Sequence, residues 1–367
     1  MKLVLFSDLH LDAPFAWLGA DRAAARARRQ ALRDTLRDVA NLARAERADA
    51  LLCGGDLYEQ ARFSQDTRAF LEQSFADLDP LPVYLAPGNH DWYGPESLYR
   101  QARWSRNVHV FREDRLAPVT LAAGLTLWGL AHRAPAFTTN PLTNFRVDRA
   151  GVHLALFHGS LRSWGAQQDG GHEPHAPFDE PEIARAGLHH AFLGHYHRPN
   201  DGATFTYPGN PDFLAFGDGP DRAAVVVTIR HDGTIHRERR RVGRTAIHDL
   251  TLDVSGCASE QDARDRVQAL LVGKVGVARV TLVGAPGDGV GLRPDGLRTV
   301  PHGLDGLQIR LGDLRPPYDF ESIATERTVR GQFVRDVHAA PLAPDERRRV
   351  LVTGLRALDG RDDLDPL

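Results

Sequence analysis

Five apolar segments of this chain end in side chains that bind metals or transfer protons. Each has the length and composition of a strand buried on both faces of a sheet. Because the carboxyl ends of neighbouring parallel strands meet at one edge of an α/β sheet, we expect these polar side chains to lie together. The segments and the residues that follow them are Lys2–Phe6 with Ser7-Asp8-Leu9-His10, Ala50–Cys53 with Gly54-Gly55-Asp56, Val83–Ala86 with Pro87-Gly88-Asn89-His90-Asp91, Val152–Phe157 with His158-Gly159, and Ala191–Gly194 with His195-Tyr196-His197.

Helical patterns alternate with the first of these strands. Residues 21–46 predict a long helix with apolar side chains on one stripe, and a second helix begins at Ser64 and continues to about residue 78. Residues 125–130 predict a further strand, and residues 223–241 a hairpin that turns at Asp232-Gly233. This alternation predicts a layered α/β domain.

The pattern changes after about residue 245, where shorter elements and a glycine-rich stretch predict a small α+β domain. We therefore expect three parts, which are residues 1–244, 245–315 and 316–367. The elements expected in the last two parts are strands at 247–254, 277–283 and 307–311, a helix that begins at Ser259, and helices at 325–337 and 345–359.

Composition excludes several classes of protein. The formal net charge is only -3, which excludes a protein that coats nucleic acid through bulk positive charge. Cys53 and Cys257 are the only cysteines, too few for a disulfide-held domain or a cysteine metal site. We find no signal-peptide pattern and no apolar run long enough to span a membrane, so we expect a cytoplasmic protein without membrane contact.

The strand-end residues are carboxylates, imidazoles and one amide, with no thiolate. This donor set suits Mn²⁺, Fe²⁺ or Zn²⁺. Two such ions need a bridging anionic ligand, and the carboxylate of Asp56 in the tight Gly54-Gly55-Asp56 turn can supply it. The sequence thus predicts a dinuclear metal site.

The order of these motifs resembles the signature of the calcineurin-like metallophosphoesterases, over residues 1 to about 215. The resemblance implies a four-layer αββα sandwich and two divalent metal ions, with Mn²⁺ favoured and Mg²⁺, Fe²⁺ or Zn²⁺ as alternatives. It also implies a metal-activated water as nucleophile and His90 as the acid that protonates the leaving group. It places Asp8, His10 and His197 on one metal, Asn89, His158 and His195 on the other, and Asp56 between them.

Further segments resemble the DNA-repair exonucleases of the SbcD and YhaO type, among them residues 7–15, 156–160, 207–211 and 329–334. That resemblance implies a Mn²⁺-dependent DNA exonuclease and endonuclease, a capping domain that contacts DNA, and terminal helices that dock on an SbcC-type coiled-coil ATPase. The alternative is a phosphatase, or a phosphodiesterase for cyclic nucleotides or other small molecules. The additional domains weigh against this alternative, because a small substrate does not require them.

Four other features each have two interpretations. Asp91 orients His90 or caps the following turn. The arginines of the run 237–241 contact DNA phosphates, or they are charged residues of a solvated edge strand. Tyr196 stacks on a base or packs at the rim of the metal pocket. His172 and His175 form an ordinary polar loop rather than a third metal site. The DNA-binding candidates are Tyr196, Arg237, Arg239 and Arg240.

Two apolar faces predict contacts between chains. Helices at 64–78 and 96–104 carry aromatic and apolar side chains that belong to the core or, as in the resembling nucleases, to a homodimer; we expect the dimer. The helix at 345–359 carries a leucine stripe that we expect to await the ATPase rather than to pack on the capping domain. The side chains concerned are Phe70, Phe75, Leu98, Tyr99 and Trp104 for the dimer, and Leu351, Leu355 and Leu358 for the partner.

Overall fold

The computed structural model describes residues 1–164, 174–217, 219, 222–287, 290–314 and 318–359. The chain divides into two compact units, Met1–Ile247 and His248–Leu367. The division falls close to the change in sequence pattern at residue 245.

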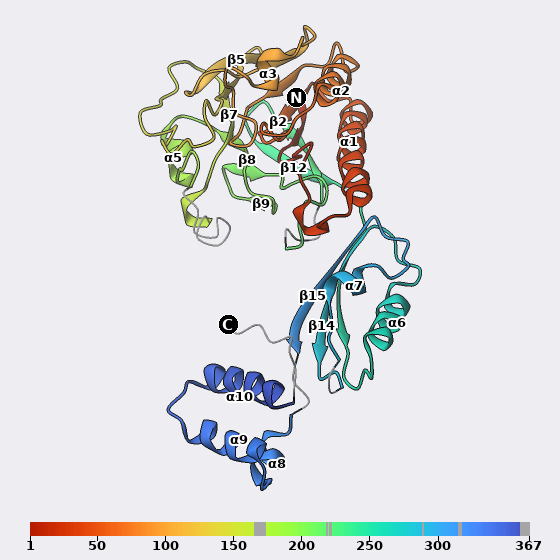
Figure 1. Ribbon diagram of the computed structural model, residues 1–367. Helices are drawn as coiled ribbons and strands as arrows, with labels where there is room; N and C mark the ends of the chain where they lie inside the picture. Colours follow the sequence, from red (N-terminus) through yellow and green to blue (C-terminus); the bar gives the residue numbers. More distant parts are fainter. Residues whose placement is uncertain (165–173, 218, 220–221, 288–289, 315–317, 360–367) are drawn as a thin grey trace. The chain divides into compact units, whose positions relative to one another are not determined.

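Two six-stranded sheets form the centre of the first unit (Figure 1). In each sheet four consecutive strands are parallel, β1 to β4 in one and β6, β7, β8 and β10 in the other. The first sheet has the order β12 (Ile235–Arg240), β11 (Ala224–Ile229), β1 (Lys2–Phe6), β2 (Ala50–Cys53), β3 (Val83–Leu85), β4 (Val108–Val110). The second has the order β5 (Ala117–Ala122), β6 (Leu125–Gly129), β7 (Val152–His158), β8 (His190–Gly194), β10 (Phe205–Tyr207), β9 (Asn200–Asp201).

Alternate side chains of the strands enter different layers, as the two-residue period of a strand requires. Leu3 and Leu5 of β1 lie in an apolar cluster that also contains Leu127 and Leu154 of the second sheet. Val4, the residue between them, belongs to a separate cluster with the apolar face of the helix that follows β1. The strands are therefore buried on both faces, which explains their continuous apolar sequences.

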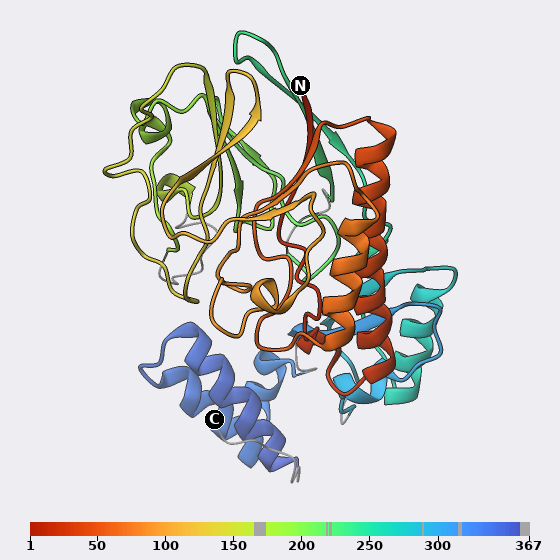
Figure 2. The same cartoon turned by 90° about the horizontal axis from the view of Figure 1, so that it is seen from above.

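Helices cover the outer face of each sheet and complete the four-layer αββα sandwich, so the predicted fold class is confirmed. Helices α1 (Arg22–Ala45) and α2 (Gln65–Ala76) lie side by side on the first sheet (Figure 2). Helix α5 (Glu180–Arg185) packs on the second sheet through Ile183. The Ser64 side chain accepts a hydrogen bond from the Thr67 N–H and fixes the start of α2, where the sequence predicts it.

The aromatic side chains expected at a dimer interface belong largely to the core. Phe75, Leu98 and Tyr99 are at most 3% exposed, and Phe70 and Trp104 pack against the same apolar cluster. The helix expected at 96–104 is reduced to α3 (Leu98–Gln101), and a short 3₁₀ turn, η1 (Ala16–Leu18), precedes α1. Homodimer formation stays a prediction without support from these side chains.

The second unit begins with a three-stranded sheet in the order β13-β14-β15. The apolar face of α6 packs on this sheet, where Val267 and Leu271 share a cluster with Val280 and Ile309. The bounds are β13 (Ile247–Asp253), α6 (Glu260–Leu271), β14 (Val277–Gly284), α7 (Pro294–Arg298) and β15 (Gly306–Leu314); α7 lies in the glycine-rich stretch, where no helix is predicted.

Three helices, α8 (Phe320–Thr325), α9 (Val329–Ala339) and α10 (Pro344–Leu358), follow in the second unit and share an apolar cluster of their own. Leu351 and Leu355 of α10 are buried in it against Ile323 and Val334. The expectation that these leucines await a partner is therefore wrong, because the neighbouring helices already cover them; of the predicted stripe, only Leu358 is exposed. No helix in the described ranges is both long and apolar enough to cross a membrane.

Candidate metal centre

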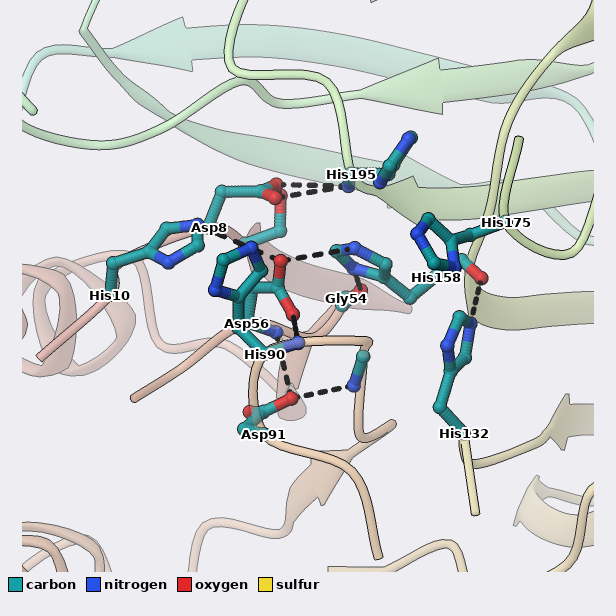
Figure 3. A network of polar contacts seen from close by, with 12 residues as sticks. Asp8, His10, Gly54, Asp56, His90, Asp91, His132, His158, His175 and His195 are labelled. Carbon is teal, nitrogen blue, oxygen red and sulfur yellow. Dashed lines mark hydrogen bonds and ion pairs between the residues drawn. The ribbon is translucent and has the colours of Figure 1, made fainter. Parts of the chain in front are cut away.

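The ends of β1, β2, β3, β7 and β8 bring their polar side chains to one place, as expected from the sheet topology (Figure 3). Three overlapping groups of carboxylate oxygens and imidazole nitrogens each lie within 4.8 Å. They consist of Asp8, His10 and His197; of His10, Asp56 and His90; and of Asp8, Asp56 and His158.

The backbone around these groups is held in conformations that side chains normally avoid. Asp8, His10 and Asp56 have φ values of 54°, 49° and 51°, in the left-handed region. Gly55, at φ 104°, has no room for a side chain, because a Cβ there would lie 2.6 Å from Nδ1 of His158. Strain of this kind persists where the surroundings impose it, and it clusters at functional sites.

Asp56 lies at the centre of the arrangement. Its Oδ2 lies 3.2 Å from Nε2 of His158 and 3.6 Å from Nε2 of His10, and its Oδ1 accepts a hydrogen bond from the His90 N–H. One carboxylate thus reaches a histidine from each proposed ligand set. This is the position that a bridging ligand requires.

The first predicted ligand set, Asp8, His10 and His197, is assembled. Nε2 of His10 and Nε2 of His197 lie 3.2 Å apart. Nδ1 of His10 lies 2.7 Å from a carboxylate oxygen of Glu59, which favours a proton on Nδ1 and leaves the Nε2 lone pair directed at the other donors. Such an arrangement suits a cation between the three side chains.

The second predicted set is Asn89, His158 and His195. The Oδ1 atom of Asn89 is buried without a hydrogen-bond partner among the described residues, although polar atoms are rarely buried unsatisfied. Nε2 of His158 is buried too, and it contacts the Asp56 carboxylate at 3.2 Å. Nδ1 of His158 contacts the Gly54 carbonyl at 3.0 Å, so its Nε2 is again the atom available to a metal. The His195 ring centroid lies 5.2 Å from that of His158, and no close group of donor atoms in the described ranges includes His195. The unsatisfied Asn89 oxygen and the His158 nitrogen beside Asp56 fit a second divalent cation.

Charge interactions inside the group are strong. Although burial opposes it, the charge of Asp56 raises the pKa of His158 to about 9. The same pairing holds the pKa of Asp56 well below its usual range despite its burial. Without metal, the carboxylate is therefore balanced by protonated histidine.

His90 lies beside the group with its side chain 46% exposed, and Glu59 is its unpredicted neighbour. Oε2 of Glu59 lies 3.0 Å from Nδ1 of His90, while Oε1 contacts His10. Burial lowers the pKa of His90, but the hydrogen bond to Glu59 and the charge of Asp56 outweigh it and raise that pKa to about 9. A glutamate three residues after Asp56 follows no motif in the sequence, so the sequence contains no signal for this contact.

Asp91 does not contact the His90 ring. Its buried carboxylate accepts hydrogen bonds from the N–H groups of Asp56, Leu57 and Gly88 and from the Tyr99 hydroxyl. The carboxylate thus holds the preceding Gly88 turn and the Asp56 loop, rather than capping the turn that follows Asp91. The assignment of Asp91 as an orienting catalytic residue is corrected, because Glu59 occupies that place.

The predicted DNA-binding arginines are engaged within the protein. Arg237 donates to the carbonyls of Gly202 and Phe205, and Arg239 donates to those of Tyr207 and Pro208. These bonds link β12 of the first sheet to the β9–β10 region of the second. Arg237 and Arg239 therefore hold the sandwich together, which corrects their assignment to DNA.

The two other DNA-binding candidates are occupied as well. Arg240 is paired with Glu238 and Glu46, as in a solvated edge strand. Tyr196 is 2% exposed, and its hydroxyl donates to the Leu161 carbonyl. A base cannot stack on a ring with this burial, so the packing interpretation of Tyr196 is the correct one.

Two further histidines border the second ligand set. Nε2 of the buried His132 contacts the carbonyl of His158 at 2.8 Å, and the His175 ring centroid lies 5.6 Å from that of His195. Neither belongs to a close group of three metal-binding side chains within the described residues. His172 lies outside these residues.

A family model matches the part of the chain that contains these residues. The family model of the calcineurin-like phosphoesterases matches residues 1–199. The uncharacterized metallophosphoesterase YhaO of Bacillus subtilis is 27% identical over 261 residues, which are 68% of this chain and 62% of that protein. A dimetal phosphatase from Danio rerio is 14% identical with a TM-score of 0.40, over 66% of this chain and 96% of that one. The protein TT1561 of Thermus thermophilus is 12% identical with a TM-score of 0.39, over 65% of this chain and 98% of that one. Because the family model covers more than half of its residues, the chain belongs to the calcineurin-like phosphoesterase family, whose members are metal-dependent hydrolases with a dinuclear centre.

Proposed function

We propose that this protein hydrolyses phosphodiester bonds of DNA, as an exonuclease and endonuclease in DNA repair or end processing, with two divalent cations, Mn²⁺ by preference. The observation that carries the hydrolytic part is the combination of a buried group of carboxylate and imidazole ligand atoms around Asp56, and the unsatisfied Oδ1 of Asn89, with one partly exposed imidazole, His90. Ligand atoms that face inward hold metal, whereas an imidazole that faces solvent can reach a substrate.

The residues divide the chemistry between them. Asp8, His10 and His197 would hold one cation, Asn89, His158 and His195 the other, and Asp56 would contact both. When bound, such cations polarise the phosphoryl group and lower the pKa of a water molecule, which makes a nucleophile near neutral pH. His90 keeps a proton on its ring through Glu59 and Asp56 and donates it to the departing alkoxide oxygen.

DNA as the substrate is supported by two features. The segments that resemble DNA-repair exonucleases extend beyond the phosphoesterase domain, and the chain adds a second unit, His248–Leu367, that a small phosphate ester does not require. With such a substrate, the protein would act in the cytoplasm. Phosphatase activity on small esters is the competing function on the same site.

The partner in this proposal is an SbcC-type coiled-coil ATPase at the terminal helices. With Leu351 and Leu355 already buried, the exposed large apolar side chains that the described part of these helices offers it are Val329, 72% exposed, and Leu358, 43% exposed. Co-purification of the two full-length proteins, repeated with Val329→Glu and Leu358→Glu, tests this assignment; unchanged co-purification of both variants would refute it.

One assay tests the substrate class. Labelled single-stranded and duplex DNA, a nitrophenyl phosphodiester and a phosphomonoester are each incubated with the purified protein in Mn²⁺ or Mg²⁺. We expect cleavage of DNA and of the small diester, with more activity in Mn²⁺, and none from Asp56→Asn. Hydrolysis of small esters with intact DNA would favour the competing function.

A further inference from the structure

Helix α1 extends well beyond α2 at the edge of the sheet that carries the metal ligands. Nη1 of Arg33 lies 2.6 Å from the Asp66 carboxylate, and its Nη2 donates to the Thr67 hydroxyl; both partners belong to the first turn of α2. Residues 22–32 of α1 therefore precede the start of α2. At 1.5 Å per residue, this free part is about 16 Å long.

Three arginines on the free part of α1 form what we call the arginine face: Arg22, Arg26 and Arg29. Their spacing of four and three residues places them on one side of the helix, in line with Arg33. Arg22 and Arg26 are exposed, and Arg29 is partly exposed. None of the three has a hydrogen-bond or ion-pair partner in the part of the chain that the structure describes.

The arginines on the same side of α1 have partners within the protein where α2 runs alongside it. Arg33 pairs with Asp66, Arg37 pairs with Asp34 and lies over the Phe70 ring, and Arg44 donates to the Asp77 carbonyl. Along the described length of α1, only the free part thus offers guanidinium groups to an external anion.

Contacts within the unit place the arginine face near the metal ligands. Asp12, two residues after His10, accepts a hydrogen bond from the Thr67 hydroxyl, the same hydroxyl that Arg33 contacts. Two side-chain hydrogen bonds, through the Thr67 hydroxyl, therefore connect the loop after β1 to Arg33 of α1. Arg33 lies one helical turn from Arg29. The free part of the helix also begins where the loop after β1 ends, on the ligand side of the sheet.

We propose that the arginine face binds the phosphate backbone of a polynucleotide whose scissile phosphate lies at the metal centre. This inference rests on the proposed function and specifies where its substrate runs. From Arg22 to Arg29 the row covers about 10 Å along the helix axis, which matches a chain of phosphates and exceeds a single phosphate group. With a net charge of only -3 for the whole chain, a local row of this kind is what a polyanion needs for attachment.

A triple variant, Arg22→Gln/Arg26→Gln/Arg29→Gln, tests the proposal in the full-length protein. Binding of labelled single-stranded and duplex DNA is measured by fluorescence anisotropy in EDTA, between 50 and 200 mM salt. The matched control, Arg37→Gln/Arg44→Gln/Arg47→Gln, removes the same charge from the second half of α1 and the turn that follows it.

The expected result is weaker binding that depends less on salt. Loss of three phosphate contacts lowers the slope of log K against log salt by about 2 for single strands and 2.7 for duplex. The ratio of the two dissociation constants, variant to parent, should therefore fall about 20- to 40-fold between 50 and 200 mM salt. The control should keep the parent slope, and hydrolysis of the nitrophenyl phosphodiester should stay within about twofold of the parent in both variants.

Two results would overturn the inference. One is that the protein cleaves DNA but the triple variant and its control show the same slope of log K against log salt. The loss of overall positive charge would then explain any loss of DNA affinity. The other is a lower melting temperature of the triple variant with unchanged DNA binding, because the arginines would then stabilise the fold. If the parent neither binds nor cleaves DNA yet hydrolyses the small diester, the proposed function itself fails.

Discussion

Replacement of Glu59 by glutamine tests whether the unpredicted carboxylate positions both a metal ligand and the proton donor. Its two oxygens lie 2.7 Å from Nδ1 of His10 and 3.0 Å from Nδ1 of His90. Both ring nitrogens donate to this carboxylate when protonated. Glutamine has one oxygen and one NH₂ group, so it can accept from only one of the two rings.

The size of the expected effect follows from the loss of one of the two hydrogen-bond acceptors. One imidazole loses its acceptor and meets an N–H group instead, so it rotates or changes tautomer. Loss of a hydrogen-bond partner behind a metal-binding histidine typically lowers metal affinity or activity 10- to 100-fold. If His90 is the ring that loses its partner, turnover falls and metal content stays constant. If His10 is the ring, metal affinity falls.

The assay measures bound metal by elemental analysis and kcat for DNA and for the nitrophenyl diester in the same preparation. Glu46→Gln is the matched control, because Glu46 is similarly buried (21% exposed against 16%) and pairs with Lys2 instead of a site histidine. Full activity together with full metal content in Glu59→Gln would refute the positioning role. An equal loss in Glu46→Gln would attribute the effect to general destabilisation.

Three further predictions follow from the same contacts. His90→Asn should lower kcat for DNA by about 10²- to 10⁴-fold and affect the nitrophenyl diester less, at constant metal content; metal depletion with equal losses on both substrates would contradict the acid role. Burial, with a smaller effect of Arg237, lowers the pKa of His190 to about 3. Below about pH 6.5 the His190 side chain is therefore protonated in the unfolded chain but stays neutral in the folded chain. Stability should fall as the pH drops below 6.5, by about 1.5 kcal/mol at pH 5 from this residue alone, and urea unfolding of metal-free His190→Gln should show a correspondingly smaller decrease than the parent. Deletion of residues 340–367 removes two buried leucines, each contributing about 1.5–3 kcal/mol, and should lower the calorimetric melting temperature of the second unit; an unchanged melting curve would restore the partner interpretation of α10.

The part of the fold that the sequence predicts best is the part that consists of buried strands. β1 and β2 begin and end where the apolar runs do, because both faces of these strands are buried and each run stops at a polar turn. β5 has alternating partly buried and exposed residues and contains a proline, so its sequence differs little from that of a loop. The predicted strands also brought the ligand side chains to one edge, since sheet topology alone decides this.

Side-chain contacts between distant segments could not be predicted. Arg237 and Arg239 look like an exposed basic run, yet the two-residue period of β12 turns both toward backbone carbonyls near β10. Glu59 contacts His90 across 31 residues of sequence, and only the folded loops bring them together. Local patterns predict which residues share an edge, whereas the partner of each polar group depends on geometry that no single segment contains.

Two histidines of the metal-free site, His158 and His90, have the same raised pKa of about 9 but differ in what metal loading should do to them. His158 is predicted to be a ligand, and an imidazole must give up its proton to bind a cation. His90 holds no metal in this proposal and keeps Glu59 as its acceptor. Metal loading near neutral pH should therefore release a proton from His158, and metal affinity should rise with pH.

Calorimetric titration of Mn²⁺ in buffers of different ionisation enthalpy measures this proton release directly. Replacement of His158 by asparagine should reduce the number of protons released, whereas His90→Asn should leave it unchanged. Equal release from the parent and from the His158 variant would show that another group supplies the proton and would contradict the assignment of His158 as a ligand.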